Sequence, residues 1–62
     1  MTKYDLRLKL IHHPNPKRII EDNFSQNYSW NDSESLYWNI INFLEIVRVN
    51  NLWNKLEKSF IL

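Results

Sequence analysis

Apolar and polar residues alternate along the N-terminal segment YDLRLKLI. Its apolar side chains fall on the even positions, namely Tyr4, Leu6, Leu8 and Leu10. A period of two is typical of a half-buried β-strand, so the pattern predicts a strand over residues 4–11. A strand needs a neighbour for its backbone groups. The runs at 17–20 and 44–49 could pair with it inside the chain, or the same strand of a second copy could pair across a two-fold axis.

Proline ends the predicted strand and marks the next element. Pro14 and Pro16 flank Asn15, which is a favourable helix N-cap. Because proline suits the first position of a helix, we expect a short helix over residues 16–24. The side chains that would face inward from this helix are Ile19, Ile20 and Phe24.

The segment 25–31 is rich in Asn and Ser, which favour turns and helix caps because their side chains compete for backbone hydrogen bonds. It therefore predicts a loop, with the aromatic side chains of Tyr28 and Trp30 packed on the core. Glu34 follows as the acidic member of a near capping box. Three adjacent residues at the end of this loop are good N-caps for the next helix: Asn31, Asp32 and Ser33.

The strongest helical pattern covers residues 33–49. At about 100° per residue, one face collects the apolar residues Leu36, Ile40, Phe43, Leu44 and Val47. The opposite half contains both polar and apolar residues: Asn39, Asn42, Glu45 and Arg48, together with Trp38, Ile41 and Val49. One apolar stripe is enough to dock a helix on a core. A second stripe indicates a second partner, which the C-terminal helix or another molecule could supply.

The C-terminal segment predicts a further helix over residues 51–61. It follows a turn at Asn50 and Asn51, because asparagine tolerates the left-handed conformation that glycine would otherwise supply. Its inner stripe consists of Leu52, Trp53, Leu56 and Phe60. The whole pattern predicts an α+β fold in a single domain over residues 1–62, with one strand followed by a short, a long and a C-terminal helix.

Composition limits how such a domain can be stabilised. A chain of 62 residues buries only about 60% of the surface that its unfolded form exposes. It contains no cysteine, so disulfides and thiolate metal sites are excluded. With 44% hydrophobic and 15% aromatic residues, it can instead build a dense core or bind another chain.

The formal net charge of +1 conceals a segmental pattern. Residues 1–20 carry five Lys or Arg and one Asp, a net charge of +4, whereas residues 21–45 carry five Asp or Glu and no Lys or Arg, a net charge of −5. A basic N-terminal strand face could follow a phosphate backbone. The residues that would contact a nucleic acid are Arg7, Lys9, Lys17 and Arg18.

No catalytic or cofactor motif is apparent. His12 and His13 are adjacent, so on an extended chain they point to opposite sides, and no spaced His or Cys offers a third metal ligand. Glycine-dependent phosphate loops are excluded because the chain has no glycine. We therefore expect no enzymatic activity, cofactor, metal or small-molecule substrate. Without a signal peptide or a long apolar stretch, we expect no membrane partner and a cytoplasmic location.

The functional prediction is based on the second apolar stripe of the predicted helix over residues 33–49. Because Trp is enriched among interface hot spots, we expect the partner-binding residues to be Trp38, Ile41, Val49 and Trp53. The sequence thus predicts a small protein–protein interaction module that self-associates as a homodimer or requires a partner protein. Binders of this size include inhibitors, antitoxin-like proteins, adaptors and assembly factors, some of them phage-encoded. The alternative is a small nucleic-acid-binding protein that uses the basic N-terminal segment.

Overall fold

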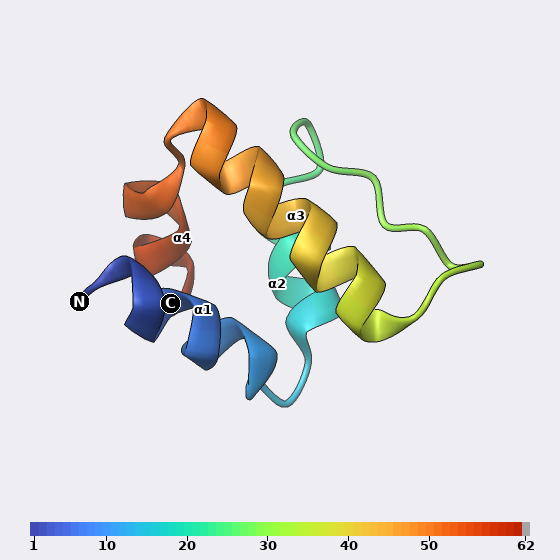
Figure 1. The fold of residues 1–62 in the computed structure, drawn as a ribbon, viewed down its shortest axis with the longest axis horizontal. Coiled ribbons are helices and arrows are strands. Elements are labelled where there is room, and N and C mark those ends of the chain that lie inside the picture. The colour runs from blue at the N-terminus through green and yellow to red at the C-terminus, as the bar shows by residue number, and fades with distance from the viewer. Residues whose placement is uncertain (62) are drawn as a thin grey trace.

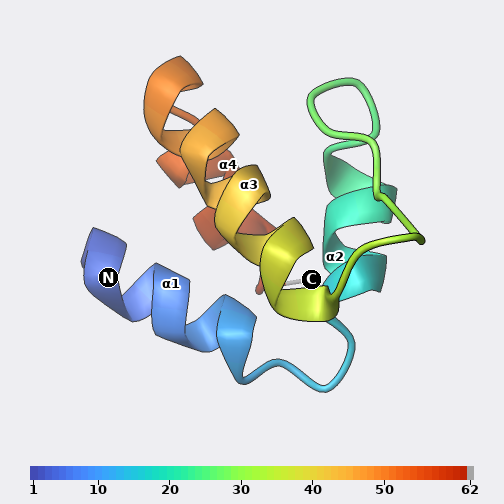
Figure 2. The same cartoon turned by 45° about the vertical axis from the view of Figure 1, so that its right-hand side comes forward.

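The computed structural model describes residues 1–61 and shows an all-helical fold (Figure 1). The described helices are α1 (Lys3–Ile11), α2 (Pro16–Asn23), α3 (Leu36–Asn50) and α4 (Trp53–Ser59). The long helix α3 packs against each of the other three, and α1 also packs against α4. Figure 2 shows α1 and α2 on opposite sides of α3, with α4 behind it. The fold is therefore organised around α3.

The predicted strand over 4–11 is wrong, and so is the α+β fold class, because these residues form α1. Thr2 is the N-cap of this helix. Its Oγ1 accepts a hydrogen bond from the Asp5 N–H at 3.1 Å, and the Asp5 carboxylate accepts one from the Thr2 N–H at 3.3 Å. This reciprocal pair is a capping box, which satisfies two of the backbone donors that a helix start leaves free.

The alternating pattern of this segment also contains a helical pattern. Leu6 and Leu10 are four residues apart, so they lie on one side of a helix, and both are buried. Tyr4 also occupies an even position of the alternating pattern, but its side chain is 65% exposed. The Leu, Lys and Arg residues of the segment are also good helix formers. Since the described residues contain no strand that could pair with it, burying one i, i+4 pair favours the helix.

Polar side chains set the starts of the next two helices. Asn15 caps α2 as expected, because its Oδ1 accepts a hydrogen bond from the Arg18 N–H at 3.3 Å. Helix α3 begins later than the predicted position 33. Its N-cap is Ser35, whose Oγ accepts a hydrogen bond from the Trp38 N–H at 3.1 Å. The three candidate caps that precede Ser35 are engaged within the loop and with other elements instead. Asn31 binds Ser33 and Asn39, and Asp32 pairs with Lys17.

An asparagine replaces glycine at the turn between α3 and α4. Asn51 adopts the left-handed conformation with φ 52°, as the sequence predicted for this turn. The Leu52 N–H donates to the Val47 carbonyl at 2.9 Å, and the Asn51 N–H donates to the Arg48 carbonyl at 3.4 Å. These two bonds form a Schellman motif. The turn leaves α4 shorter at both ends than the predicted 51–61.

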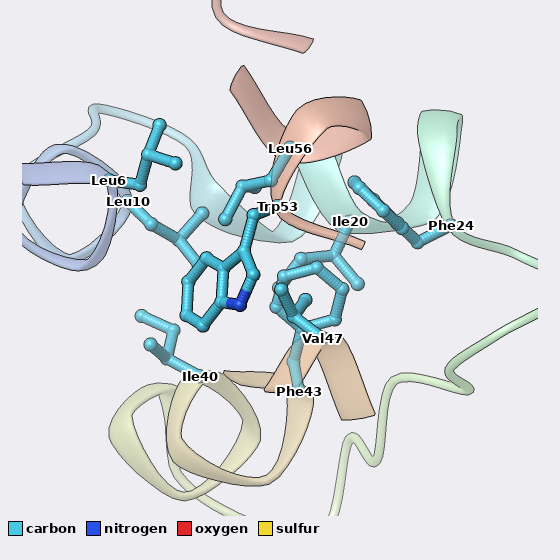
Figure 3. Packing of buried hydrophobic residues seen from close by; sticks show 9 residues of the cluster. All are labelled: Leu6, Leu10, Ile20, Phe24, Ile40, Phe43, Val47, Trp53 and Leu56. Carbon is cyan, nitrogen blue, oxygen red and sulfur yellow. The ribbon is translucent and has the colours of Figure 1, made fainter. Parts of the chain in front are cut away.

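Buried apolar side chains from every helix, together with Phe24 just after α2, form one core (Figure 3). They are Leu6, Leu10, Ile20, Phe24, Ile40, Phe43, Val47, Trp53 and Leu56. The rings of Phe24 and Phe43 meet edge to face with centroids 4.9 Å apart. The accessible surface of 4368 Å² is close to the roughly 4300 Å² expected for a compact monomer of this mass. One copy of the chain therefore closes its own core.

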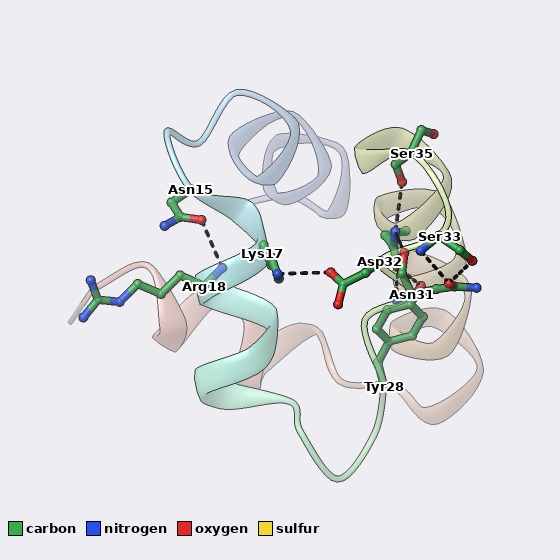
Figure 4. A network of polar contacts seen from close by, with 9 residues as sticks. Asn15, Lys17, Arg18, Tyr28, Asn31, Asp32, Ser33 and Ser35 are labelled. Carbon is green, nitrogen blue, oxygen red and sulfur yellow. Dashed lines mark hydrogen bonds and ion pairs between the residues drawn. The ribbon is translucent and has the colours of Figure 1, made fainter.

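A buried amide on α3 holds the loop between α2 and α3. Asn39 is fully buried, and its Oδ1 accepts hydrogen bonds from the Tyr28 hydroxyl and the Asn31 N–H, both at 2.8 Å. Its Nδ2 donates to the carbonyls of Asn31 at 3.0 Å and Ser35 at 2.9 Å. These bonds use the full hydrogen-bonding capacity of the amide. Figure 4 shows Tyr28, Asn31 and Ser35 gathered at this point.

Replacing Asn39 should destabilise the fold more than replacing any exposed asparagine. In Asn39→Ala, the Tyr28 hydroxyl and the Asn31 N–H lose their partner, and the Asn31 and Ser35 carbonyls each lose one of two bonds. We therefore expect a loss of about 3 kcal/mol. Tyr28→Phe should cost about 1 kcal/mol because it removes one bond. Asn42→Ala is the matched control, since Asn42 is exposed on the same helix. Urea unfolding measures all three, and equal effects of Asn39→Ala and Asn42→Ala would contradict this account.

The cap of α1 should make stability depend on pH. Hydrogen bonding to Thr2 lowers the pKa of the Asp5 carboxyl below its ordinary value. Such a group stabilises the fold above its unfolded pKa, and this contribution disappears as the pH falls through its folded pKa. We expect Asp5→Asn to be less stable than the wild type at neutral pH and equally stable in strong acid. Thermal unfolding of both proteins across this range tests it, and a difference in stability that does not change with pH would contradict the role of the Asp5 carboxylate.

Candidate protein-binding surface

The side of α3 turned away from the core carries four exposed apolar side chains. Tyr37 is 60% exposed, Trp38 40%, Ile41 63% and Val49 68%. Together with the charged residues Glu45 and Arg48, they form what we call the outer face of α3. The buried residues of α3 are Asn39, Ile40, Phe43 and Val47. Because the core closes beneath α3, the outer face is surplus to folding.

The charged part of the outer face is one ion pair within α3. The Arg48 Nη2 lies 2.8 Å from the Glu45 Oε2, and the Arg48 Nε donates to the Glu45 Oε1 at 3.2 Å. This bidentate pairing fixes the plane of the guanidinium. The hydrogen bond and charge of Arg48 lower the pKa of the Glu45 carboxyl, and the charge of Arg7 on α1 lowers it further.

The outer face divides into two unlike halves along the helix. Its N-terminal half presents Tyr37, Trp38 and Ile41, whereas its C-terminal half presents the Glu45–Arg48 pair and Val49. Between them Asn42 donates from its Nδ2 to the Trp38 carbonyl at 2.7 Å, so its side chain is turned toward its own helix. One half is therefore aromatic and apolar, and the other presents a planar cation beside a small apolar side chain.

Trp53, which the sequence grouped with the partner-binding residues, lies elsewhere. It is only 6% exposed and belongs to the core. Two cations of α1 lie over its ring, with the Arg7 Cζ 5.0 Å and the Lys3 Nζ 5.7 Å from the ring centroid. Its position between α1 and the core follows from the helical form of residues 3–11, which the sequence analysis assigned to a strand. The other three candidates lie together on the outer face.

The basic residues proposed to contact nucleic acid do not share one face. Arg7 lies over the Trp53 ring, and Lys9 lies over the Phe60 ring with its Nζ 5.5 Å from the centroid. In a helix, residues two apart point to nearly opposite sides, so the shared face expected of a strand is lost.

The two basic residues of α2 are both paired with carboxylates. The Lys17 Nζ lies 3.2 Å from the Asp32 Oδ1 (Figure 4), and the Arg18 Nε lies 3.3 Å from the Asp22 Oδ2. Hydrogen bonding to Asp32 raises the pKa of Lys17 above its ordinary value. Acidic partners therefore offset much of the positive charge on this side of the fold.

A surface hollow of about 410 Å³ brings together a serine, a histidine and an aspartate: Ser59, His13 and Asp22. Each is engaged elsewhere. The Ser59 hydroxyl donates to the Lys55 carbonyl at 2.8 Å, the His13 Nδ1 accepts from the Asn15 N–H at 3.0 Å, and Asp22 is paired with Arg18. Nucleophilic catalysis needs a hydrogen bond from the hydroxyl to the histidine, and none joins them in the described chain.

The described residues also offer no metal site, and a second surface hollow lies beside the loop between α2 and α3. Within residues 1–61, no group of three or more His, Asp and Glu side chains is placed to hold a metal ion. A second hollow of about 350 Å³ lies beside the loop and is lined by Glu21, Ser25, Tyr28, Ser29 and Trp30. Burial raises the pKa of Tyr28, whose hydroxyl is bound to Asn39.

Three residues of the outer face were absent from the predicted contact set. They are Tyr37, Glu45 and Arg48. Their signal was present in the sequence, since Tyr37 lies four residues before Ile41 and Glu45 lies three residues before Arg48, spacings that place side chains together on a helix. Asn39 gave no such signal, because a polar residue on the polar half of a helix is ordinarily solvated.

The comparisons with known proteins identify no relative. No protein-family model matches the chain, and no curated protein or solved structure matches it significantly. Among residues 1–61, none of the helices has the length and apolar character needed to cross a bilayer. The surface of the protein is therefore the basis on which its function is inferred.

The ion pair on the outer face can be tested by titration. Removing the guanidinium in Arg48→Gln should raise the pKa of the Glu45 carboxyl toward its ordinary value, because its main hydrogen-bond partner and nearest positive charge are lost. Side-chain carbon chemical shifts measured against pH report this pKa directly. Arg18→Gln should leave it unchanged, and an unchanged pKa in Arg48→Gln would contradict the pairing.

Proposed function

We propose that this protein is a non-catalytic protein-binding module that docks a partner protein on the outer face of α3. The supporting observation is that Trp38, Ile41 and Val49 are 40–68% exposed although the core beneath them is complete. Exposed apolar side chains gathered on one face mark interaction sites, whereas scattered ones are ordinary. Here they share one helix face with a bidentate Arg–Glu pair.

The composition of the face favours a protein partner. Aromatic residues and Arg are enriched at protein interfaces, and Trp, Tyr and Arg dominate their hot spots. The outer face has one of each in Trp38, Tyr37 and Arg48. They lie on a regular helix, so their positions are fixed before binding and little ordering is required.

The two competing functions have weaker support. For nucleic-acid binding, Lys17 and Arg18 are paired with carboxylates, and Arg7 and Lys9 lie over different rings. For catalysis, the hollow that contains Ser59 and His13 lacks the hydrogen bond that would activate the serine. The basic side chains are therefore not arranged on one face for nucleic-acid binding, and the serine and histidine are not arranged for catalysis.

A charged substitution on the outer face should abolish partner binding without unfolding the protein. Trp38→Asp should change the unfolding free energy by less than about 1 kcal/mol, since Trp38 is exposed and Asp suits the first turn of a helix. Trp53→Ala should cost about 3–5 kcal/mol because that ring is in the core. Proteins captured from a lysate of the source cells by the wild type should be lost from Trp38→Asp.

Tyr4→Asp is the matched control, because Tyr4 is an exposed aromatic residue on α1 and not on α3. It should capture the same proteins as the wild type, and a captured protein should bind again when purified. Capture that is equal in all three forms would refute docking on α3. Retention of nucleic acid that weakens steeply with salt would favour the alternative function instead.

A further inference from the structure

We propose that the occupant of the outer face is a second copy of this chain, with the two α3 helices packed antiparallel about a two-fold axis. This inference depends on the proposed function and names its partner. A two-fold interface requires a surface that is complementary to itself, with each residue contacting its counterpart on the other copy. The two unlike halves of the outer face meet this requirement.

The spacing of the residues defines a single register. Positions 38, 41, 45 and 48 follow one another at intervals of three, four and three, which is the repeat of a helix-pairing seam. In an antiparallel pair, Trp38 would lie opposite the second copy's Arg48, and Ile41 would lie opposite the second copy's Glu45. The midpoint between positions 38 and 48 is position 43, and so is the midpoint between positions 41 and 45. Both contacts therefore form together in one symmetric arrangement.

The chemistry of the pairs favours this register. The bidentate pairing with Glu45 fixes the orientation of the planar Arg48 guanidinium, and a planar cation stacks well on a Trp ring. Val49 lies next to Arg48 and would extend the apolar contact with Trp38. Ile41 would cover the aliphatic part of the opposing Glu45, whose carboxylate stays bound to its own Arg48.

A parallel arrangement places like charges together. In that case Glu45 would face the second copy's Glu45, and Arg48 would face the second copy's Arg48, which costs energy at close range. The antiparallel arrangement separates the like charges along the helix axis and places each charged half against an aromatic half. Charge complementarity therefore selects the orientation.

The exposed apolar area is close to what a small dimer interface buries. A standard interface buries about 800 Å² on each partner, a little over half of it apolar, or roughly 450 Å². The four apolar side chains of the outer face expose on the order of 400 Å² between them. The helices that pack against α3 are α1, α2 and α4. Figure 2 shows them beside and behind α3, so the side of α3 toward the viewer is not crossed by a described helix.

Sedimentation equilibrium over about 1 µM to 1 mM, the range of weak association, tests the dimer. The wild type should be dimeric at the upper end. Trp38→Ala and Arg48→Ala should each weaken dimerisation at least tenfold, while circular dichroism shows unchanged helicity. Tyr4→Ala and Arg18→Ala are the controls, because they remove an exposed aromatic residue of α1 and an exposed paired arginine of α2 and leave α3 unchanged. Both should dimerise like the wild type.

The orientation can be tested by cross-linking, since the chain has no cysteine of its own. When Ile41→Cys and Glu45→Cys variants are mixed and oxidised, the antiparallel register predicts mainly the mixed disulfide, because positions 41 and 45 are level across the axis. A parallel pair predicts mainly like-with-like disulfides. Mass spectrometry separates these products, and a predominance of like-with-like products would overturn the register.

The result separates this inference from the proposed function. A wild type that stays monomeric at the highest concentration refutes the dimer, and the proposed function survives if capture of another protein still depends on Trp38. A dimer that is unaffected by both Trp38→Ala and Arg48→Ala refutes the inference as well, because its interface then lies elsewhere. Loss of both dimerisation and capture in the controls would overturn the outer face as a site altogether.

Discussion

The amide of Asn39 is the constraint on which the arrangement of this fold depends. The connection between α2 and α3 contains no regular helix, so its backbone groups have to find partners elsewhere. Asn39 binds the loop at Tyr28 and Asn31 and binds the end of the loop at Ser35, all from one fully buried side chain. A buried polar group is tolerated only when its bonds are made. Here they also determine where the loop rests and where α3 begins.

That anchor gives the two sides of α3 different roles. Ile40, Phe43 and Val47 complete the core, and Asn39 fastens the loop beside them. Helices α1, α2 and α4 meet α3 from this side. The outer face then carries apolar side chains that the fold does not bury. An aromatic half and a cationic half on one helix form a surface suited to another helix, and these residues therefore support the proposed binding role.

Local signals in the sequence correctly predicted the start of one helix, one turn and the second apolar stripe. Asn15 and Pro16 marked α2, and the asparagine pair before α4 marked a turn that needs a left-handed residue. The second apolar stripe of α3 was visible because Trp38, Ile41 and Val49 interrupt a polar half. These features depend on neighbours three or four residues away, and such neighbours are fixed once a helix forms.

Long-range contacts decided the remainder. The segment 4–11 satisfies the period of a strand and also supplies the Leu6–Leu10 pair of a helix. Its sequence alone does not choose between them, because the choice depends on whether another strand or the α3–α4 surface is available to bury it. The burial of Trp53 also depends on a long-range contact. Helix α1 and its cations cover the Trp53 ring only when residues 3–11 are helical.

The sequence by itself determined the helical character of residues 36–50 and 53–59, the turn at Asn51 and the surplus of apolar residues on α3, because each depends on local spacing and on residue type. Only the tertiary structure decided that the chain is all-helical, that Asn39 is an anchor and that Trp53 is buried. Those outcomes depend on contacts between segments far apart in the chain, where the free energy of burial and of satisfying polar groups outweighs local preference.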